Sequence, residues 1–351
     1  MKVLVTGGAG FIGSNFVHHL LRTHPEDQVT VVDKLTYAGN LVNLDAVLKD
    51  PRLQFTRLDI CDPAIADVVK GMDAVVHFAA ESHVDRSIED ASPFVRTNVE
   101  GTWRITDACR RNGVARFVHV STDEVYGSLG PAGHFSEMSP LDPTSPYAAS
   151  KAASDLLVLS AFKTHGFPAI VTRCTNNYGP FQFPEKFIPL MICQALADQP
   201  LPVYGDGRNV RDWIHVSDHC RALDLILRSG VEGEIYNIGG GWEMENISVA
   251  RMILGALNRP DTLLKFVSDR PAHDRRYALD FKKLTDKLGW KPQRDFDQGL
   301  SDTIRWYQEN TDWLQQTRSD EYQNYFERHY LHRERNFGSP DAKRQYAVKG
   351  E

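Results

Sequence analysis

The chain has 351 residues, of which 42% are hydrophobic, so it can bury one large core or two ordinary ones. Lys and Arg total 40 against 46 for Asp and Glu, and this net charge of −6 gives no reason to expect nucleic acid or an anionic membrane as a partner. No apolar run approaches the roughly 20 residues that cross a bilayer, and the five scattered cysteines lack the paired spacing of a zinc site. We therefore expect a cytoplasmic globular protein that holds no metal.

A glycine-rich turn follows the first predicted strand. Residues 3–6 form a short buried strand, residues 7–13 read Gly-Gly-Ala-Gly-Phe-Ile-Gly, and residues 14–22 have a helical pattern. Glycines suit a turn whose backbone angles a Cβ would obstruct, and they let a pyrophosphate approach the N–H groups at the positive end of the helix. The spacing is looser than the strict G-x-G-x-x-G form, so a turn without a ligand remains an alternative for this motif alone.

The next two predicted strands end in acidic residues. Strand 29–32 ends in Asp33, which lies 33 − 13 = 20 residues beyond Gly13. An acidic residue there accepts hydrogen bonds from both hydroxyls of an adenosine ribose and repels a 2′-phosphate, which favours NAD over NADP. Strand 53–58 ends in Asp59 and Ile60, which we expect to border the adenine.

The fourth predicted strand, residues 74–78, leads into a small-residue segment at 79–83 that lets backbone approach a cofactor. His83 ends this segment and is a candidate to face a substrate, although a loop histidine without a ligand fits the sequence as well. A helical pattern follows over residues 93–112. It places these apolar residues on or near one face: Val95, Val99, Trp103 and Ile105.

Three oxygen-bearing side chains, Thr122, Asp123 and Glu124, follow a fifth apolar strand at residues 116–120. Ligands bind at the carboxyl ends of strands in an open α/β sheet, so this placement makes a catalytic hypothesis. A polar loop that caps the next helix is the alternative, because polar residues are common in loops.

A predicted helix over residues 147–161 begins with Tyr147 and carries Lys151 one turn later. Side chains at i and i+4 project from the same face of a helix. An ammonium near a phenol stabilises the phenolate, so we expect Lys151 to lower the pKa of Tyr147 and to make the tyrosine usable as a base.

Taken together, these motifs resemble the extended short-chain dehydrogenase/reductases, nucleotide-sugar enzymes with a tightly held NAD, and among them the 4,6-dehydratases. The likeness covers nearly all of residues 1–330, and the Thr122-Asp123-Glu124 triplet is its discriminating part. It implies an α/β fold with a Rossmann-type doubly wound parallel sheet and a smaller, interleaved α/β substrate-binding domain. It also implies that NAD contacts Gly7, Gly10, Phe11, Ile12, Gly13, Asp33, Lys34, Leu35, Thr36, Asp59, Ile60, Ala79, Ala80, Ser82, Thr97, Tyr147, Lys151 and Asn177.

The resemblance further implies dehydration of dTDP-glucose to dTDP-4-keto-6-deoxyglucose. In that reading Tyr147 takes the C4 hydroxyl proton with help from Lys151 and Thr122, while hydride passes to NAD. Glu124 then removes the proton at C5 and Asp123 protonates the departing C6 oxygen. The hydride returns to C6, so the net reaction is loss of water.

The second half of the chain is expected to choose the substrate. A nucleoside diphosphate needs local cations, and Lys186, Arg211 and the cluster from Arg270 to Arg276 are the candidates, with surface salt bridges as the alternative. Ala272 stands where the family often has Gly, which puts the local backbone in question. The expected substrate contacts are His83, Thr122, Asn176, Lys186, Phe187, Pro202, Val203, Tyr204, Arg211, Asn246, Arg270, His273 and Tyr277.

The domain division follows from the irregular pattern beyond Asn177. We expect residues 1–178 to form the NAD-binding domain, with 209–232 returning to it, and residues 179–208 and 233–330 to form the nucleotide-sugar domain. Residues 333–351 are charged and nearly free of aliphatic side chains, so we expect a disordered tail. By resemblance, a homodimer forms through the helices that begin near Thr97 and Tyr147.

Two other functions remain open at this point. A nucleotide-sugar 4-epimerase would use the same Tyr147 and NAD without an acid or base at C5 and C6. A non-catalytic protein that senses NAD would need the glycine turn alone, and the intact triplet and Tyr/Lys pair argue against it.

Overall fold

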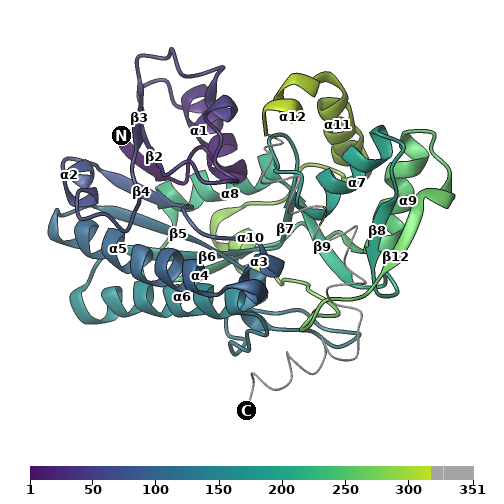
Figure 1. Cartoon of the computed structure of the whole chain (residues 1–351). Helices are drawn as coiled ribbons and strands as arrows, with labels where there is room; N and C mark the ends of the chain where they lie inside the picture. Colours follow the sequence, from purple (N-terminus) through teal and green to yellow (C-terminus); the bar gives the residue numbers. More distant parts are fainter. Residues whose placement is uncertain (318–326, 328–351) are drawn as a thin grey trace.

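A seven-stranded parallel sheet forms the centre of the larger half of the molecule (Figure 1). The computed structural model describes residues 1–317 and residue 327, so the predicted tail at 333–351 lies outside the described residues. In spatial order the sheet contains β10 (Ile235–Ile238), β6 (Ala169–Cys174), β5 (Arg116–Thr122), β4 (Ala74–His77), β1 (Lys2–Thr6), β2 (Gln28–Asp33) and β3 (Leu53–Arg57).

Helices cover both faces of this sheet, so its strands are buried on both sides and read as continuous apolar runs. One face carries α1 (Phe11–Thr23), α8 (Val216–Ser229) and α10 (Lys282–Leu288). The other carries α2 (Ile65–Val69), α5 (Thr102–Arg111) and α6 (Pro146–His165), with α3 (Val84–Glu89), α4 (Ser92–Phe94) and the π-helical η2 (Val95–Gly101) leading into α5.

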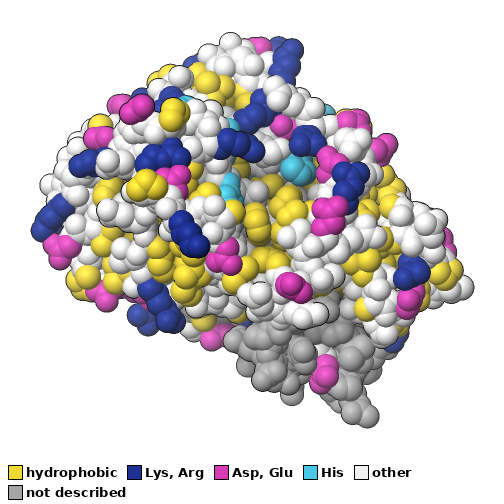
Figure 2. All heavy atoms as spheres, turned by 90° about the horizontal axis from the view of Figure 1, so that it is seen from above, with side chains coloured by type: hydrophobic (Ala, Val, Ile, Leu, Met, Phe, Trp, Pro, Cys, Tyr) yellow, Lys and Arg dark blue, Asp and Glu magenta, His cyan; other side chains and the backbone are white. Residues whose placement is uncertain are grey.

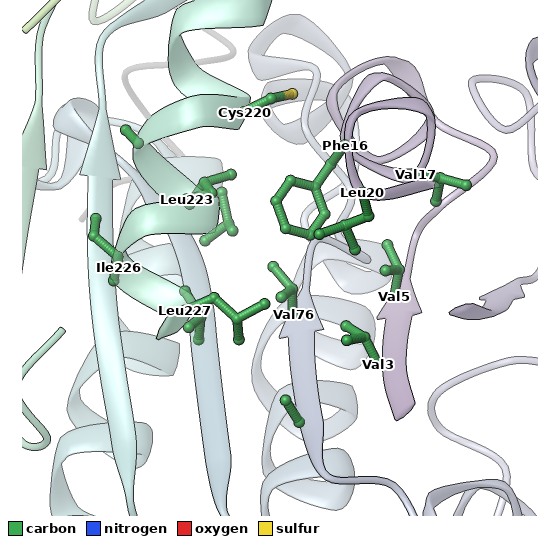
Figure 3. Packing of buried hydrophobic residues seen from close by; sticks show 14 of the residues in the cluster. Val3, Val5, Phe16, Val17, Leu20, Val76, Cys220, Leu223, Ile226 and Leu227 are labelled. Atoms are coloured by element: carbon green, nitrogen blue, oxygen red, sulfur yellow. The ribbon is translucent and has the colours of Figure 1, made fainter. Parts of the chain in front are cut away.

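The alternating directions of the side chains along β1 show how an apolar core forms on each face of the large sheet. Val3 and Val5 lie in the cluster beneath α1 and α8, together with Phe16 and Leu223 (Figure 3), whereas Leu4 packs in the cluster on the opposite face. Successive strand residues face opposite sides of a sheet, so one apolar strand serves both cores. The Rossmann-type doubly wound sheet predicted from the sequence is confirmed.

The smaller half is built from two short sheets and four helices. The sheets contain β7 (Asn176–Tyr178), β9 (Val210–His215) and β11 (Glu243–Glu245) in one, and β8 (Leu201–Tyr204) and β12 (Leu264–Val267) in the other. The helices are α7 (Phe187–Leu196), α9 (Asn246–Ala256), α11 (Phe296–Glu309) and α12 (Thr311–Thr317). Three short 3₁₀ turns complete the described elements: η1 (Leu41–Leu44), η3 (Asp123–Tyr126) and η4 (Asp261–Leu263).

The segment that returns to the large sheet differs from the predicted one. Within 209–232 only α8 packs on that sheet, while β9 pairs with β7 and β11 in the smaller half. The strand that extends the large sheet is β10, which pairs with β6 and lies beyond residue 232. The pattern of a strand followed by a helix does not say which sheet the strand joins, and the domain boundaries as a whole stay a prediction.

The helix predicted over 93–112 is divided into α4, η2 and α5. Val95, Val99 and Trp103 line one groove on the outer surface, as the pattern predicts, and Val95 and Trp103 are 56% and 38% exposed. Ile105 is fully buried and packs in the core instead. Within the described residues, no helix is both long and apolar enough to cross a membrane.

Candidate active site

The chain leaves β1, turns outward through β2 and β3, and crosses back to β4, so the order of the sheet reverses between β1 and β4. Ligands of doubly wound sheets bind at the carboxyl ends of the strands at such a switch point. A long cavity runs along this edge, and Figure 2, which looks down on the molecule, shows hydrophobic, basic and histidine side chains around a hollow.

The glycine turn at the end of β1 is fixed by its geometry. Gly7 has φ 69°, and a Cβ there would lie 2.6 Å from the backbone nitrogen of Ala79. A Cβ on Gly13 would lie 2.2 Å from the carbonyl oxygen of Gly7. Only glycine fits these contacts, and the turn delivers the N-terminus of α1 to the cavity, where it suits a pyrophosphate.

Asp33 ends β2 with its carboxylate buried against backbone. Its Oδ2 accepts from the Ala9 N–H at 3.0 Å and its Oδ1 accepts from the Leu35 N–H at 2.8 Å. Burial raises the pKa of this carboxyl, and the backbone hydrogen bonds oppose that rise. Its place in the cavity wall fits the ribose hydroxyls of a dinucleotide.

Every residue predicted to contact NAD lines this cavity except Leu35. Leu35 has a left-handed backbone, φ 57°, and its side chain packs against the apolar core. Its N–H serves Asp33, so its contribution to the site is through the backbone. The predicted residues that do line the cavity are Gly7, Gly10, Phe11, Ile12, Gly13, Asp33, Lys34, Thr36, Asp59, Ile60, Ala79, Ala80, Ser82, Thr97, Tyr147, Lys151 and Asn177.

The triplet at the end of β5 lies at the start of η3, which Thr122 caps, and all three residues also line the cavity. The capping alternative is therefore confirmed, and the catalytic role stays a prediction. Thr122 Oγ1 accepts from the Glu124 N–H at 3.3 Å and donates to Asp123 Oδ1 at 3.2 Å. Asp123 is 2% exposed, and its Oδ2 has no hydrogen-bond partner within the described part of the chain.

Burial and the charge of Glu124 raise the pKa of Asp123 well above its usual range, which favours the protonated form of this carboxyl. Burial also raises the pKa of Glu124, and the nearby cations Arg270, Lys186 and Arg211 offset only part of that rise. The two adjacent carboxyls therefore differ in environment, which is the condition for one to donate a proton while the other accepts one.

Tyr147 and Lys151 come from the first turns of α6, which Ser145 caps by accepting from the Ala148 N–H at 3.1 Å. Both side chains are buried, and Lys151 Nζ donates to the Val120 carbonyl at 2.9 Å. Burial lowers the pKa of Lys151 to about 8. Burial and Glu124 raise the pKa of Tyr147 well above its usual value, opposite to the predicted direction, because the phenolate is desolvated in the buried site.

A second cavity continues from the first toward the smaller half. His83, Glu124, Asn176, Glu185 and Lys186 line both cavities, so the Glu124 carboxyl lies where the two meet. The predicted substrate residues in its wall are His83, Asn176, Lys186, Phe187, Pro202, Tyr204, Arg211, Asn246, Arg270, His273 and Tyr277, and Thr122 lies in the first cavity.

Val203 is the exception among the predicted substrate residues. It is fully buried in β8, between Pro202 and Tyr204, which both line the cavity. Its side chain lies toward Gly207, where an added Cβ would be 2.7 Å from Val203 Cγ1. The alternation of a strand sends the middle of three residues to the other face.

Three cations of the second cavity are held by the protein's own oxygen atoms. Lys186 Nζ donates to the Ser82 carbonyl at 2.5 Å, and Arg211 Nη2 donates to the Asp274 carbonyl at 3.0 Å. Arg270 pairs with Asp85 at 3.4 Å, yet its Nε is buried with no hydrogen-bond partner among the described residues. This arrangement fits a diphosphate, which would supply the missing acceptors.

The rest of the arginine cluster points elsewhere. Arg275 makes an exposed ion pair with Asp206 at 2.8 Å, and Arg276 pairs with Glu243 at 2.6 Å. For Arg275 the surface salt bridge is the correct reading, whereas Arg276 is buried in its ion pair, and neither residue lines the second cavity. Ala272 has φ 50°, a left-handed backbone conformation that glycine adopts more readily than alanine.

Several polar residues of the cavities were missed by the sequence reasoning. Glu185 is 4% exposed and binds Arg86 through both carboxylate oxygens, at 3.1 and 2.5 Å. Asp85 Oδ2 accepts from the Tyr204 hydroxyl at 2.8 Å. These pairs join segments about a hundred residues apart, and no local spacing signals them.

The comparisons with known proteins agree with this geometry. The sequence profile of the family described as GDP-mannose 4,6 dehydratase matches residues 4–303. A dTDP-glucose 4,6-dehydratase from Actinoplanes sp. is 53% identical over 319 residues, which cover 89% of this chain and 99% of the relative. The chain belongs to the nucleotide-sugar 4,6-dehydratase family.

Solved structures place the chain within this dehydratase family and apart from its neighbours. The dTDP-glucose 4,6-dehydratase of Streptomyces venezuelae, solved with NAD bound, has a TM-score of 0.89 and 51% identity, covering 91% of this chain and 100% of that one. A UDP-glucose 4-epimerase of Thermus thermophilus, solved with NAD, reaches a TM-score of 0.82 but 32% identity, covering 88% and 100%. The dehydratases are thus nearer in sequence than this epimerase.

Proposed function

We propose that the protein converts dTDP-glucose to dTDP-4-keto-6-deoxyglucose and uses NAD as a cofactor that each turnover regenerates. The observation that carries this proposal is the pair Asp123 and Glu124, which line the same cavity as Tyr147 and Lys151. Removal of water across two carbons needs one group to take a proton and another to give one. An oxidation alone, or an epimerisation at C4, needs no acid or base at C5 and C6 beyond the tyrosine that serves the C4 hydroxyl.

The first step is oxidation at C4 of the sugar. When bound, NAD accepts a hydride from C4 and later returns it to C6. Tyr147 takes the proton of the C4 hydroxyl, and the Thr122 hydroxyl orients the reacting oxygens. Because the pKa of Lys151 is about 8, the ammonium keeps its charge at neutral pH and stabilises the Tyr147 phenolate.

The second step is elimination of water. The ketone at C4 acidifies the C5 proton, and Glu124 removes it while the bond between C6 and its oxygen breaks. Asp123 gives its proton to the departing oxygen, which leaves as water. The proton on Glu124 then returns to C5, and the proton that Tyr147 took balances the one that Asp123 gave.

The second cavity is assigned to the nucleoside diphosphate. Lys186, Arg211 and Arg270 supply positive charge for the two phosphates, and Tyr204 and Phe187 supply flat surface for the base. The preference for thymine rests on the relatives, whose names state dTDP-glucose as their substrate.

Incubation with dTDP-glucose, followed by the alkaline ultraviolet absorbance of the 4-keto product, tests the activity. UDP-, GDP- and CDP-hexoses run in parallel define the base preference. If none of the dTDP-, UDP-, GDP- and CDP-hexoses yields a 4-keto product, the proposal is contradicted.

A Glu124→Gln variant separates the dehydratase from the 4-epimerase. It keeps the shape of the side chain but removes the base at C5, so the dehydratase stalls after oxidation and reduced cofactor accumulates at its own absorbance band. An epimerase, which does no chemistry at C5, would keep its rate.

We further propose a homodimer, because apolar side chains gather on the outer face of η2, α5 and α6. Val95 and Leu156 are 56% and 57% exposed, and Trp103 lies beside a shallow groove with Leu157. A second copy of the chain would bury them. Measurement of the molar mass by light scattering tests this proposal. Trp103→Glu should shift the protein toward monomer. A wild-type protein with the mass of a monomer contradicts the proposal.

We also propose a cytoplasmic location. All five cysteines are free and buried, which suits a reducing compartment, where disulfides are rare. Within the described residues, no group of three His, Cys, Asp or Glu side chains is arranged to hold a metal ion, and none of the assigned steps requires one.

A further inference from the structure

Residues 34–44 run along the wall of the first cavity, from the end of β2 to η1. Lys34, Thr36 and residues 37–39 line the cavity directly. Tyr37, in the middle of the segment, packs edge-on against Phe183 with ring centroids 5.8 Å apart and lies 3.9 Å beneath the guanidinium of Arg86. We call residues 34–44 the strap, because they close the side of the cavity next to Asp33.

The far end of the strap is tied to the glycine turn through one carbonyl. The oxygen of Ala9 accepts from the Asn40 N–H at 3.0 Å and from Asn43 Nδ2 at 2.8 Å. The carbonyl of Asn43 also contacts Nε2 of His18 on α1, at 2.8 Å. Asn43 is 2% exposed, so the tie is shielded from water.

Trp313 of α12 completes this chain of contacts from the other end of the sequence. Its indole N–H donates to Asn43 Oδ1 at 2.7 Å, although 270 residues separate the two. Figure 1 shows α12 on the same side of the molecule as α1. Asn43 is therefore held through both ends of its amide, by Trp313 on one and by Ala9 on the other.

An aromatic cluster fixes Trp313 in turn. Its ring lies 5.0 Å from Trp306, 6.0 Å from Tyr307 and 6.2 Å from Phe181, centroid to centroid. The Tyr307 hydroxyl donates to the carbonyl of Gln182, a residue that lines the cavity. The same cluster thus supports the cavity at a second place.

We infer that the strap must open for NAD to exchange, and that Trp313 locks it closed through Asn43. The inference rests on the proposed use of NAD. Trp313 touches neither cofactor nor substrate, so it is a positioning residue. Loss of the Trp313 indole N–H leaves Asn43 Oδ1 buried without a hydrogen-bond donor. This raises the free energy of the closed strap but not of the open strap, in which water can donate to Oδ1.

Trp313→Phe removes the N–H and keeps an aromatic ring in the cluster. Trp306→Phe is the matched control, because it makes the same change in the same cluster without touching Asn43. The purified, NAD-loaded chains are mixed with labelled NAD, and the rate at which label enters the protein is measured. We expect Trp313→Phe to exchange about fivefold faster than wild type, the effect of one buried hydrogen bond, and Trp306→Phe to exchange at the wild-type rate.

Amide hydrogen exchange, read by mass spectrometry on the NAD-loaded chains, gives an independent readout. We expect faster exchange in residues 34–44 of Trp313→Phe and unchanged protection in β5. This comparison also separates local opening from global unfolding, which would raise exchange in both places.

An unchanged NAD exchange rate in Trp313→Phe, or an equal rise in Trp306→Phe, overturns the lock. Global loss of protection in Trp313→Phe overturns it as well, because the tryptophan would then hold the fold and not the strap. If the wild-type chain holds NAD and dehydrates dTDP-glucose but the variants do not behave as expected, only the lock is rejected and the proposed function stands. A wild-type chain that binds no NAD overturns both.

Discussion

Replacing Asp123 by Asn should make the protein more stable and less active at neutral pH. Asp123 is 2% exposed, and burial together with the charge of Glu124 raises its pKa well above the usual range. This carboxyl therefore ionises more readily in the unfolded chain than in the folded chain. Ionisation favours the unfolded chain, so this residue lowers the free energy of unfolding.

The size of the stability gain follows from what Asn keeps and what it removes. Its Oδ1 still accepts from Thr122 Oγ1, a 3.2 Å contact, while an amide has no ionised form for burial, Glu124 and Asp212 to disfavour. We expect a gain of about 0.5 to 2 kcal/mol, the range of single stabilising substitutions at sites that function holds away from their optimum. The gain should vanish below about pH 4, where the unfolded carboxyl is also protonated.

The activity should change in the opposite direction. An amide cannot give up a proton to the C6 oxygen, and loss of a general acid typically lowers the rate by about 10²- to 10⁴-fold. Because Glu124 is intact, the Asn variant should still exchange the C5 proton of the oxidised sugar with heavy water. Urea unfolding at pH 7 and pH 4, the rate of keto-product formation and the C5 exchange measured by NMR check these outcomes. A variant that is less stable at pH 7, or that keeps the wild-type rate, refutes the assignment of Asp123 as the acid.

Three further predictions follow from the site. The kcat/KM should fall as pH rises through about 8, because Lys151 then loses the proton that stabilises the Tyr147 phenolate; a pH profile without this limb contradicts the assigned role. Arg270→Gln should raise the KM for the nucleotide sugar about 10- to 100-fold. Arg275→Gln breaks only an exposed ion pair and should change this KM less than about twofold. Equal effects of the two substitutions would reject the assignment of Arg270 to the phosphates. Ala272→Gly should raise the free energy of unfolding by about 0.5 to 1 kcal/mol, because relief of the left-handed strain at φ 50° exceeds the entropy cost of glycine; thermal unfolding at unchanged kcat tests this.

The cofactor half was predictable because its signals are local. The glycine turn, Asp33 and the Tyr147/Lys151 pair each sit within a few residues of a strand end or helix start, so the fold brings them to one edge once the sheet is parallel. Leu35 shows where such local signals fail, because its left-handed backbone, which the sequence pattern does not reveal, turns its side chain into the core.

The substrate half was less predictable because its contacts depend on how distant segments meet. Val203 was assigned by its neighbours, but the strand's alternation buried it. The choice of β10 over β9 as the added strand of the large sheet depends on pairing with β6, which no local pattern encodes. The raised pKa of Tyr147 reflects burial that only the packed structure reveals.

The most direct test of the central claim is the fate of the hydrogen at C4. dTDP-glucose deuterated at C4 is incubated with the NAD-loaded protein, and the product is examined by NMR and mass spectrometry. If oxidation, elimination and reduction occur in the one cavity formed by Tyr147, Asp123 and Glu124, the deuterium should appear in the C6 methyl group of the 4-keto product. Product without deuterium at C6, or deuterium retained at C4 of an epimerised sugar, would contradict the account.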